Sequence, residues 1–458
     1  MSSEELEHFR LKSLDQGQFT GTFLAVHAVR DGFLMMHCGV GCKHKATSQV
    51  ADHDLGRSAD NKGWTEVGDA ELIEGADHRI GPYIRSWYDR MRPGLIIVNS
   101  VTFLDLTGED TRHSVDEANK SVPCPVHFVS VPGYEGDLFS GYSAVVLAIA
   151  RGLDWSIEPG PPTDVTIAGY MFDRYEGDHV GNLAQLASLL KSIGCTLKTT
   201  LFSGALYSEL AQAPQAGTLL AFPLMHPQIR RLKRWTKRTP TPTDLPMGMG
   251  GTAHWLRTVA EATGVDGGRV EQIIAAQRQR TEQRLALSKM VLSGMRVAVF
   301  ADLPHAVGLL HVLHDLGCRP VLVGLRGHTL GGREAFEEMA KRSEAPLNPD
   351  MPVFENPSIH RVREEMERLI TGRQVDAIIG SSTDINAVAS LNASIAVQID
   401  HGGAWTGSGP KIIEFGFPCS KHHVVRPSPT LGFAGVLGWA DRLINAPRLW
   451  DTWRTQPT

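Results

Sequence analysis

Met295-Arg296-Val297-Ala298-Val299-Phe300 is an apolar run with the length and β-branched content of a buried strand. A helical pattern over His305–Leu316 follows it, and a second apolar run, Arg319–Leu325, follows the helix. Two more strand-like runs, Val375–Ser382 and Ser394–Ile399, continue the series. Strands that alternate with helices predict a parallel sheet covered by helices on both faces.

The same alternation of strand and helix occurs twice before this stretch. Apolar runs bounded by turn residues predict further strands at 33–36, 94–100, 125–133, 165–170 and 195–200. We therefore predict an α/β protein of three Rossmann-like domains, each with a parallel sheet flanked by helices. The predicted domains are residues 1–158, residues 163–288 with a long linking helix, and residues 289–458.

The segments between these units carry turn and linker signals. Glu158-Pro159-Gly160-Pro161-Pro162 predicts a linker, and the Pro- and Gly-rich stretch Thr239–Gly251 predicts a loop that crosses between domains. Within it, Gly248-Met249-Gly250-Gly251 lacks the Lys-Ser/Thr of a phosphate loop, and no G-x-G-x-x-G follows a strand. The chain itself is therefore not expected to bind ATP or a dinucleotide.

Composition and charge exclude several classes of partner. The chain has 458 residues, 42% of them hydrophobic and 21% charged, and a net charge of −5. This balance argues against bulk binding to nucleic acid or to a membrane surface, and no apolar stretch is long enough to span a membrane. One basic run, Arg230–Arg238, is either a solvated face or a docking site for an acidic protein or an anionic substrate.

The cysteine pattern favours a reducing compartment. Six cysteines in a chain of this length, with one close pair, do not form a disulfide framework. The polar N-terminal residues Met1–Ser13 lack the features of a secretory signal, so we expect a cytoplasmic protein. Cys195 and Cys318 each lie between a helix and a strand, where a cysteine is usually a small buried hydrophobic residue.

The close pair follows the first predicted strand. In Phe33–Cys42 an apolar run ends in Cys38 and Cys42, with glycines that permit a tight turn around them. Two cysteines cannot complete a zinc or iron–sulfur site, which needs about four ligands. Distant residues of this chain or a partner chain would have to supply the others. Loops at strand ends lie at domain surfaces, which favours the partner. The alternative is that both are merely buried thiols.

Carboxylates gather after the next strand. Asp105, Glu109 and Asp110 lie just past the end of the run 94–100, where functional groups collect in open parallel sheets.

Four segments together resemble one known family. His37-Cys38-Gly39-Val40-Gly41-Cys42 resembles the H-G-S-Q-G-C loop of nitrogenase component-one β subunits. Asn99–Asp110 resembles the family's S-T-T-C-M-A-E-V-I-G-D-D, Phe417–His423 its F-P-I-F-D-R-H-H, and Thr430–Gly435 its T-L-G-Y-E-G. In order and spacing these segments span most of the chain. The sequence is thereby identified as a β-type member of the nitrogenase component-one-like superfamily.

The resemblance implies a cluster site with a reduced ligand set. Cys42 falls on a family ligand of the interface iron–sulfur cluster, whereas the family's other two cysteines fall at Gly17 and Thr102, which supply no thiolate. Cys38 is a candidate replacement ligand, and Asp105 a poorer oxygen ligand. A four-iron cluster with most of its cysteines from a partner chain is favoured over an eight-iron P-cluster, and both stay open.

The resemblance also implies a role and partners. We expect a β-type subunit of a nitrogenase-like, ATP-dependent reductase, such as chlorophyllide reductase or methylthio-alkane reductase. It would pair with an α-type subunit in an α2β2 heterotetramer and receive electrons from an ATP-hydrolysing iron protein. The catalytic centre would lie in the α-type partner. The alternatives are an N-type scaffold for assembly of the nitrogenase cofactor and a structural partner without a cluster.

Overall fold

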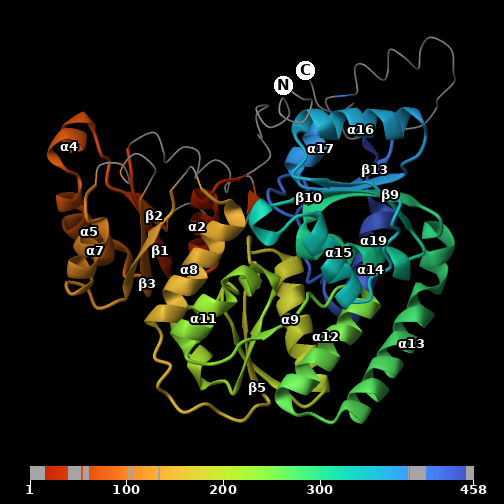
Figure 1. Ribbon diagram of the computed structural model, residues 1–458, viewed down its shortest axis with the longest axis horizontal. Helices are drawn as coiled ribbons and strands as arrows, with labels where there is room; N and C mark the ends of the chain where they lie inside the picture. Colours follow the sequence, from red (N-terminus) through yellow and green to blue (C-terminus); the bar gives the residue numbers. More distant parts are fainter. Residues whose placement is uncertain are drawn as a thin grey trace. The chain divides into compact units, whose positions relative to one another are not determined.

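The computed structural model describes residues 16–39, 53–54, 61–100, 104, 108–132, 135–389, 391 and 409–449. These residues form an α/β fold with three parallel sheets flanked by helices, as the sequence predicts (Figure 1). One compact unit contains residues 16–243 and 258–266 and holds the first two sheets. A second unit contains residues 244–257 and the described residues from 267 onward, and it holds the third sheet. The three domain boundaries given above stay predictions.

Each sheet has a simple parallel order. The first has the order β2-β1-β3-β4, the second β6-β5-β7-β8 and the third β11-β10-β9-β12-β13. The strands are β1 (Gly32–His37), β2 (Lys62–Trp64), β3 (Leu95–Ser100), β4 (Val126–Ser130), β5 (Asp164–Ala168), β6 (Thr196–Thr200), β7 (Thr218–Ala221), β8 (Thr241–Pro242), β9 (Arg296–Asp302), β10 (Arg319–Arg326), β11 (Val353–Glu355), β12 (Ala377–Gly380) and β13 (Lys411–Glu414).

Helices connect most consecutive strands. In the first unit they are α2 (Gln18–His27), α4 (Asp69–Glu74), the 3-10 helix η1 (Asp77–Arg79), α5 (Ile80–Met91), α7 (Thr111–Asn119), α8 (Leu138–Gly152), α9 (Gly177–Ser192), α10 (Tyr207–Leu210), η2 (Ala213–Gln215), η3 (Pro223–Gln228) and α11 (Ile229–Thr236). The later helices are α12 (Gly248–Thr263), α13 (Gly267–Leu292), α14 (Leu303–Asp315), η4 (His328–Leu330), α15 (Arg333–Arg342), α16 (Ile359–Thr371), α17 (Ser382–Ala389) and α19 (Gly432–Asn445).

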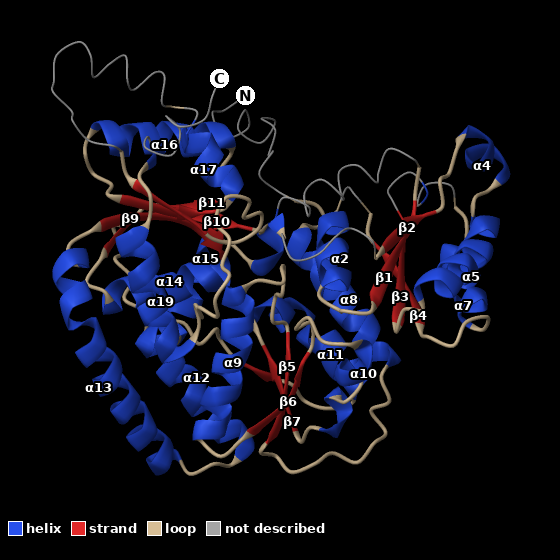
Figure 2. Ribbon diagram, turned by 180° about the vertical axis from the view of Figure 1, so that it is seen from behind, coloured by secondary structure: helices blue, strands red, loops and turns tan. Residues whose placement is uncertain are grey.

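The two central strands of the first sheet, β1 and β3, are buried on both faces because they are largely apolar. All six residues of β1 and of β3 are buried. Phe33 and Met35 share a core cluster with α5 and α7, so the alternate residues Leu34 and Met36 face the other side, where α2 and α8 lie (Figure 2). A continuous apolar run, rather than an alternating one, is what burial on both faces requires.

Helices α2 and α8 cross at unusually close range. A Cβ on Gly21 would lie 1.9 Å from the Leu138 carbonyl oxygen, and one on Gly141 would lie 2.0 Å from the Gln18 carbonyl oxygen. Two backbones can approach this closely only where neither carries a side chain. This pair of glycines therefore fixes the position of α2, the helix that precedes β1, against α8.

The third sheet has the same layered arrangement. Helices α14, α15 and α19 cover one face, and α16 and α17 cover the other (Figure 2). Val362 and Met366 of α16 pack in one core cluster with Ala298, Phe300 and Ile378 of the sheet. The long helix α13 packs along α19.

Two predicted segments of the sequence differ from the structure or cannot be compared with it. The expected strand Ser394–Ile399 lies outside the described residues, and the strand that follows α17 in them is β13. The loop predicted over Thr239–Gly251 is wrong in two places, because it contains the short strand β8 (Thr241–Pro242) and because α12 begins at Gly248. The glycines are needed there for packing: a Cβ on Gly250 would lie 2.6 Å from Nδ1 of His311.

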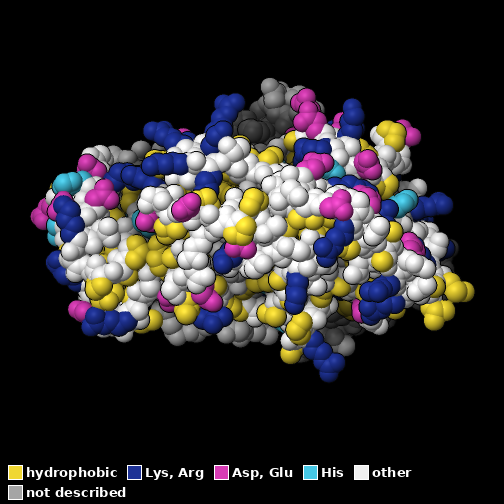
Figure 3. All heavy atoms as spheres, turned by 90° about the horizontal axis from the view of Figure 1, so that it is seen from below, with side chains coloured by type: hydrophobic (Ala, Val, Ile, Leu, Met, Phe, Trp, Pro, Cys, Tyr) yellow, Lys and Arg dark blue, Asp and Glu magenta, His cyan; other side chains and the backbone are white. Residues whose placement is uncertain are grey.

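The surface carries both signs of charge. On the face seen from below, Lys and Arg side chains are interspersed with Asp, Glu and hydrophobic ones (Figure 3). The basic run forms α11, in which Leu232 is buried while Lys233 and Arg231 lie on the outer side, consistent with a solvated face. None of the helices in the part that the structure describes has the length and apolar character needed to cross a membrane.

Candidate functional site

The predicted cluster loop leaves the first sheet at its carboxyl edge. His37, the last residue of β1, pairs in register with Ser100, the last residue of β3. The segments that continue toward Cys42 and toward Thr102 therefore leave the sheet from adjacent positions. In open parallel sheets, functional groups gather at this edge.

Cys38 is the one predicted cysteine ligand that the structure describes, and it lies at this edge. The residue is fully buried. Its N–H donates to Oγ1 of Thr65 at 3.2 Å, and its carbonyl oxygen accepts from the N–H of Val67 at 2.9 Å. Cys38 thus continues the pairing of β1 with the chain that follows β2. Cys42, Thr102 and Asp105 lie outside the described residues.

Gly17 lies at the same edge, at the start of α2. The four-residue connection from His27 to Gly32 makes α2 run antiparallel to β1. In the second turn of α2, Oγ1 of Thr22 accepts a hydrogen bond of 2.9 Å from Nδ2 of Asn99 in β3. Gly17 is the N-cap of α2, with a φ of −76°, and among the described residues no atom lies within 4 Å of a Cβ built on it.

The other described cysteines are packing residues. Burial raises the pKa of Cys124 to about 11 and that of Cys318 to about 12, so neither thiol ionises near neutral pH. Cys195 and Cys318 are both buried, which confirms their predicted role. Buried Cys419 donates to the His422 carbonyl oxygen at 3.2 Å. The donor set at the loop is therefore too small for a complete cluster, and an iron–sulfur cluster fits these residues only if another chain contributes ligands.

His37 is buried beside the loop with one ring nitrogen engaged. Its Nδ1 lies 2.9 Å from Oγ1 of Thr65, and its Nε2 lies 3.4 Å from Oδ1 of Asp77. Burial lowers the pKa of His37 to about 4, and the charge of Arg79 adds to this effect while that of Glu109 opposes it. The ring is therefore neutral at neutral pH.

Two carboxylates complete this cluster of polar groups. Glu109, just before α7, accepts the N–H of Ala76 at 2.8 Å and that of Asp77 at 2.8 Å. Asp77, the first residue of η1, accepts a hydrogen bond of 2.8 Å from Oγ1 of Thr111. Burial raises the pKa of Asp77, and the neighbouring charge of Glu109 raises it further against the effect of Thr111. One ligand atom from each of His37, Asp77 and Glu109 lies within 4.8 Å of the other two.

The sequence indicates this cluster only in part. The pattern of apolar runs places Glu109 past a strand end, and the resemblance of the loop points to His37. Asp77 belongs to no motif and lies 40 positions along the chain from His37, so sequence reasoning does not reach it. The one available signal is its place at the start of a helix that follows a glycine-bounded loop.

Comparison with known proteins identifies the family of this chain. The sequence pattern of the family described as "Nitrogenase component 1 type Oxidoreductase" matches residues 17–447. This chain belongs to that family. The nitrogenase molybdenum-iron protein beta chain of Rippkaea orientalis is 24% identical over 79% of this chain and 69% of its own length. A component of the light-independent protochlorophyllide reductase of a Bradyrhizobium strain is 26% identical over 84% of this chain and 66% of its own length.

Other relatives extend the comparison. The cofactor biosynthesis protein NifE of Clostridium pasteurianum is 20% identical over 94% of this chain and 88% of its own length. The solved structure of nitrogenase Cp1 at pH 6.5 covers 97% of this chain and 94% of that chain, with a TM-score of 0.73 and 15% identity. At that identity the likeness establishes the nitrogenase component 1 fold and nothing finer.

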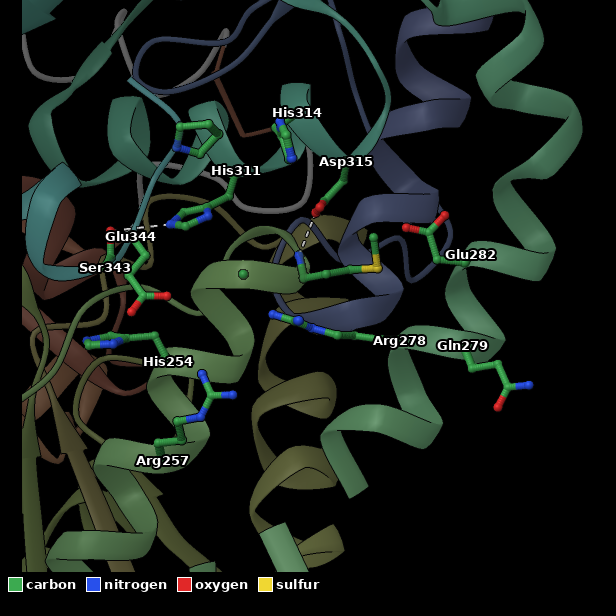
Figure 4. Close-up of a pocket in the computed structure, with 13 residues that line it drawn as sticks. His254, Arg257, Arg278, Gln279, Glu282, His311, His314, Asp315, Ser343 and Glu344 are labelled. Carbon is green, nitrogen blue, oxygen red and sulfur yellow. Dashed lines mark hydrogen bonds between the residues drawn. The ribbon is translucent and has the colours of Figure 1, made fainter. Parts of the chain in front are cut away.

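This member of the nitrogenase component 1 family also has a polar pocket near its third sheet. The cavity of about 400 Å³ is lined by residues of α12, α13 and α14 and by the segment after α15 (Figure 4). His311 points toward Ser343, and its Nε2 lies 3.3 Å from Oγ. Burial lowers the pKa of His311 to about 4. Asp315 accepts the N–H of Met249 at 2.6 Å and so caps the start of α12.

Asp315 predicts a pH dependence of stability. Burial raises the pKa of Asp315 from 3.8 to about 6, with the bond from Met249 opposing the effect. The folded chain therefore binds the proton more tightly than the unfolded chain, and stability falls as pH rises from about 4 to about 6. We expect Asp315→Asn, whose amide oxygen keeps the cap, to gain up to about 3 kcal/mol relative to the native chain between about pH 4 and pH 7.

Urea unfolding at the two pH values measures this difference. Glu344→Gln, which changes an exposed carboxylate of the same pocket, is the matched control and should shift stability by less than about 0.5 kcal/mol. An Asp315→Asn variant whose stability relative to the native chain is the same at both pH values would show that the carboxylate is not buried as described.

Proposed function

We propose that this chain is the β-type subunit of a nitrogenase-like, ATP-dependent reductase. It shares an iron–sulfur cluster with an α-type partner through Cys42, at the carboxyl edge of the first sheet. The observation that carries the proposal is the register of β1 and β3. In a member of this family, it brings side by side the starts of the segments that continue toward Cys42 and toward Thr102.

The chain's own residues would prepare this edge for electron transfer. When bound, a cluster supplies a one-electron relay between an iron protein and a catalytic centre in the partner. The fully buried residues of β1 and β3 exclude water from the sheet that leads to this edge, which lowers the local dielectric constant. Thr65 holds the backbone of Cys38 and the ring of His37, so the start of the loop is fixed. Gly17 contributes no ligand, and most thiolates would come from the partner.

Co-expression with an α-type chain tests the proposal. We expect the two chains to co-purify as an α2β2 complex with visible iron–sulfur absorbance, and to reduce a substrate when reductant, ATP and an iron protein are supplied. A colourless complex without iron would contradict the shared cluster and favour a structural partner without one. A coloured complex without turnover would contradict the reductase role.

A second candidate is a scaffold for cofactor assembly. The similarity to NifE spans 94% of this chain, more than the similarity to either of the other two relatives described above. A scaffold would release its metal cofactor to an acceptor protein without consuming substrate. Transfer of iron from the purified complex to an apo-acceptor, in the absence of turnover, would favour this candidate over the reductase.

A further inference from the structure

A metal centre formed by this chain alone is suggested by the polar cluster at the carboxyl edge of the first sheet. Its three members come from separate elements: His37 ends β1, Asp77 begins η1 and Glu109 precedes α7. One nitrogen or oxygen atom from each lies within 4.8 Å of the others, which is the spacing of ligands around a single ion. No cysteine is among the three, so the donor chemistry differs from that of the loop.

In the described part of the chain, the two carboxylates have no lysine or arginine partner. Among the residues that the structure describes, no lysine or arginine forms an ion pair with Asp77 or Glu109. Arg79 is committed elsewhere: it pairs with Glu71 at 3.0 Å and donates to the carbonyl oxygens of Thr65 and Glu66 at 2.8 Å and 2.6 Å. Backbone N–H groups and one hydroxyl stabilise the carboxylates but carry no full charge. Two carboxylates this close repel each other, and a cation between them would remove the repulsion.

His37 points to the same conclusion from an independent direction. Its side chain is 0% exposed, and Nε2 has no hydrogen-bond partner in the described part of the chain. The 3.4 Å to Oδ1 of Asp77 is longer than a normal hydrogen bond of about 2.9 Å. An unsatisfied buried nitrogen is destabilising, and it needs an explanation. Because Nδ1 is held by Thr65, Nε2 is the nitrogen that is aimed at the carboxylates.

We propose that His37, Asp77 and Glu109 bind one divalent transition-metal cation through an imidazole nitrogen and two carboxylate oxygens. A neutral imidazole and two carboxylates suit Mn²⁺, Fe²⁺ or Zn²⁺. The side chain of Asp77 is 16% exposed, so water can complete the coordination. The ion ties β1, η1 and the start of α7 together at the carboxyl edge of the first sheet. This site does not depend on the proposed reductase function, because the ligands all come from this chain.

Manganese titration of the full chain tests the site. Mn²⁺ is the probe because it is a hard cation that binds thiolates poorly, so Cys38 and Cys42 do not compete. After treatment of the chain with a chelator, we expect one Mn²⁺ to bind per chain. The loss of the electron paramagnetic resonance signal of the free ion measures this binding. Asp77→Asn should weaken the binding of Mn²⁺ by tenfold or more, because it removes one charged ligand.

A matched variant controls for charge. Asp110→Asn removes the same charge one residue from Glu109, and asparagine keeps the helix cap that Asp110 makes with the N–H of His113. We expect this variant to bind Mn²⁺ as the native chain does. Equal weakening by both substitutions would mean that surface charge attracts the ion, and it would overturn the proposal.

A second measurement needs no variant. Pulsed electron paramagnetic resonance of bound Mn²⁺ should show coupling to a ¹⁴N nucleus, as a directly bound imidazole gives. Absence of this coupling, or absence of stoichiometric binding, would overturn the site and leave the two carboxyl groups to share a proton. Both results are obtained with the native chain, so a folding defect in Asp77→Asn would leave the test intact.

Discussion

Cys42→Ser in a complex with an α-type partner is expected to remove most of the iron of the interface cluster. Serine keeps the size of the side chain but offers an alcohol in place of a thiolate, which is a far poorer ligand for iron–sulfur clusters. Activity with an iron protein should fall with the iron. Iron content and the visible absorbance of the purified complex measure the effect directly.

Two further cysteine substitutions are needed to interpret this result. Cys195→Ser is the control, because that sulfur lies 3.6 Å from Oγ1 of Thr263, where a serine hydroxyl finds a partner, and iron should be retained. Cys38→Ser separates a ligand from a packing residue: loss of iron assigns the sulfur to the cluster, and retention assigns it to the core. If Cys42→Ser keeps both iron and activity, the shared-cluster proposal is wrong.

Gly141→Ala is expected to destabilise the first unit by about 3 kcal/mol or more, at the upper end for overpacking. The new methyl group would lie 2.0 Å from the Gln18 carbonyl oxygen. That atom belongs to the backbone of α2, so relief requires the helix to shift rather than a side chain to rotate. Thermal or urea unfolding of the full chain measures the loss.

The matched control is Gly81→Ala in the first turn of α5. Its Cβ would meet nothing closer than an Arg85 nitrogen at 4.0 Å, and alanine favours helix more than glycine does. This variant should be neutral or slightly more stable. If both alanine variants have the stability of the native chain, then α2 and α8 do not pack as closely as described.

The strands that the sequence predicts most clearly are those whose interior residues are all buried. β1, β3 and β9 are apolar along their length because helices cover both faces, and such runs are visible without knowledge of the fold. β13 gives no such signal, because Lys411-Ile412-Ile413-Glu414 is short and ends in charges. The first turn of α12 has the composition of a loop, since glycine usually disfavours helix. The glycines pack there against His311, which lies about 60 residues further along the chain, so the sequence nearby does not reveal the contact.

The residues of the candidate site also differ in whether the sequence reveals them. Cys38 and Glu109 are recognisable because each follows a clear strand, and parallel strands deliver their ends to one edge. Asp77 is not, because what makes it a ligand is the distance of its carboxylate from His37 and Glu109. That distance is set by the packing of η1 against α7 and by the bonds of Glu109 to the η1 backbone. No local pattern in the sequence encodes it.

Gly17 separates the architecture of this edge from its chemistry. The resemblance puts a family cysteine at this position, and no atom of the residues that the structure describes lies within 4 Å of a Cβ built there. The backbone at Gly17 has a negative φ that any residue adopts. Nothing in the packing of α2 therefore records whether the position carries a sulfur. Exchange between glycine and cysteine here would alter the number of thiolates offered to a cluster while leaving the helix, the sheet and their contacts as they are.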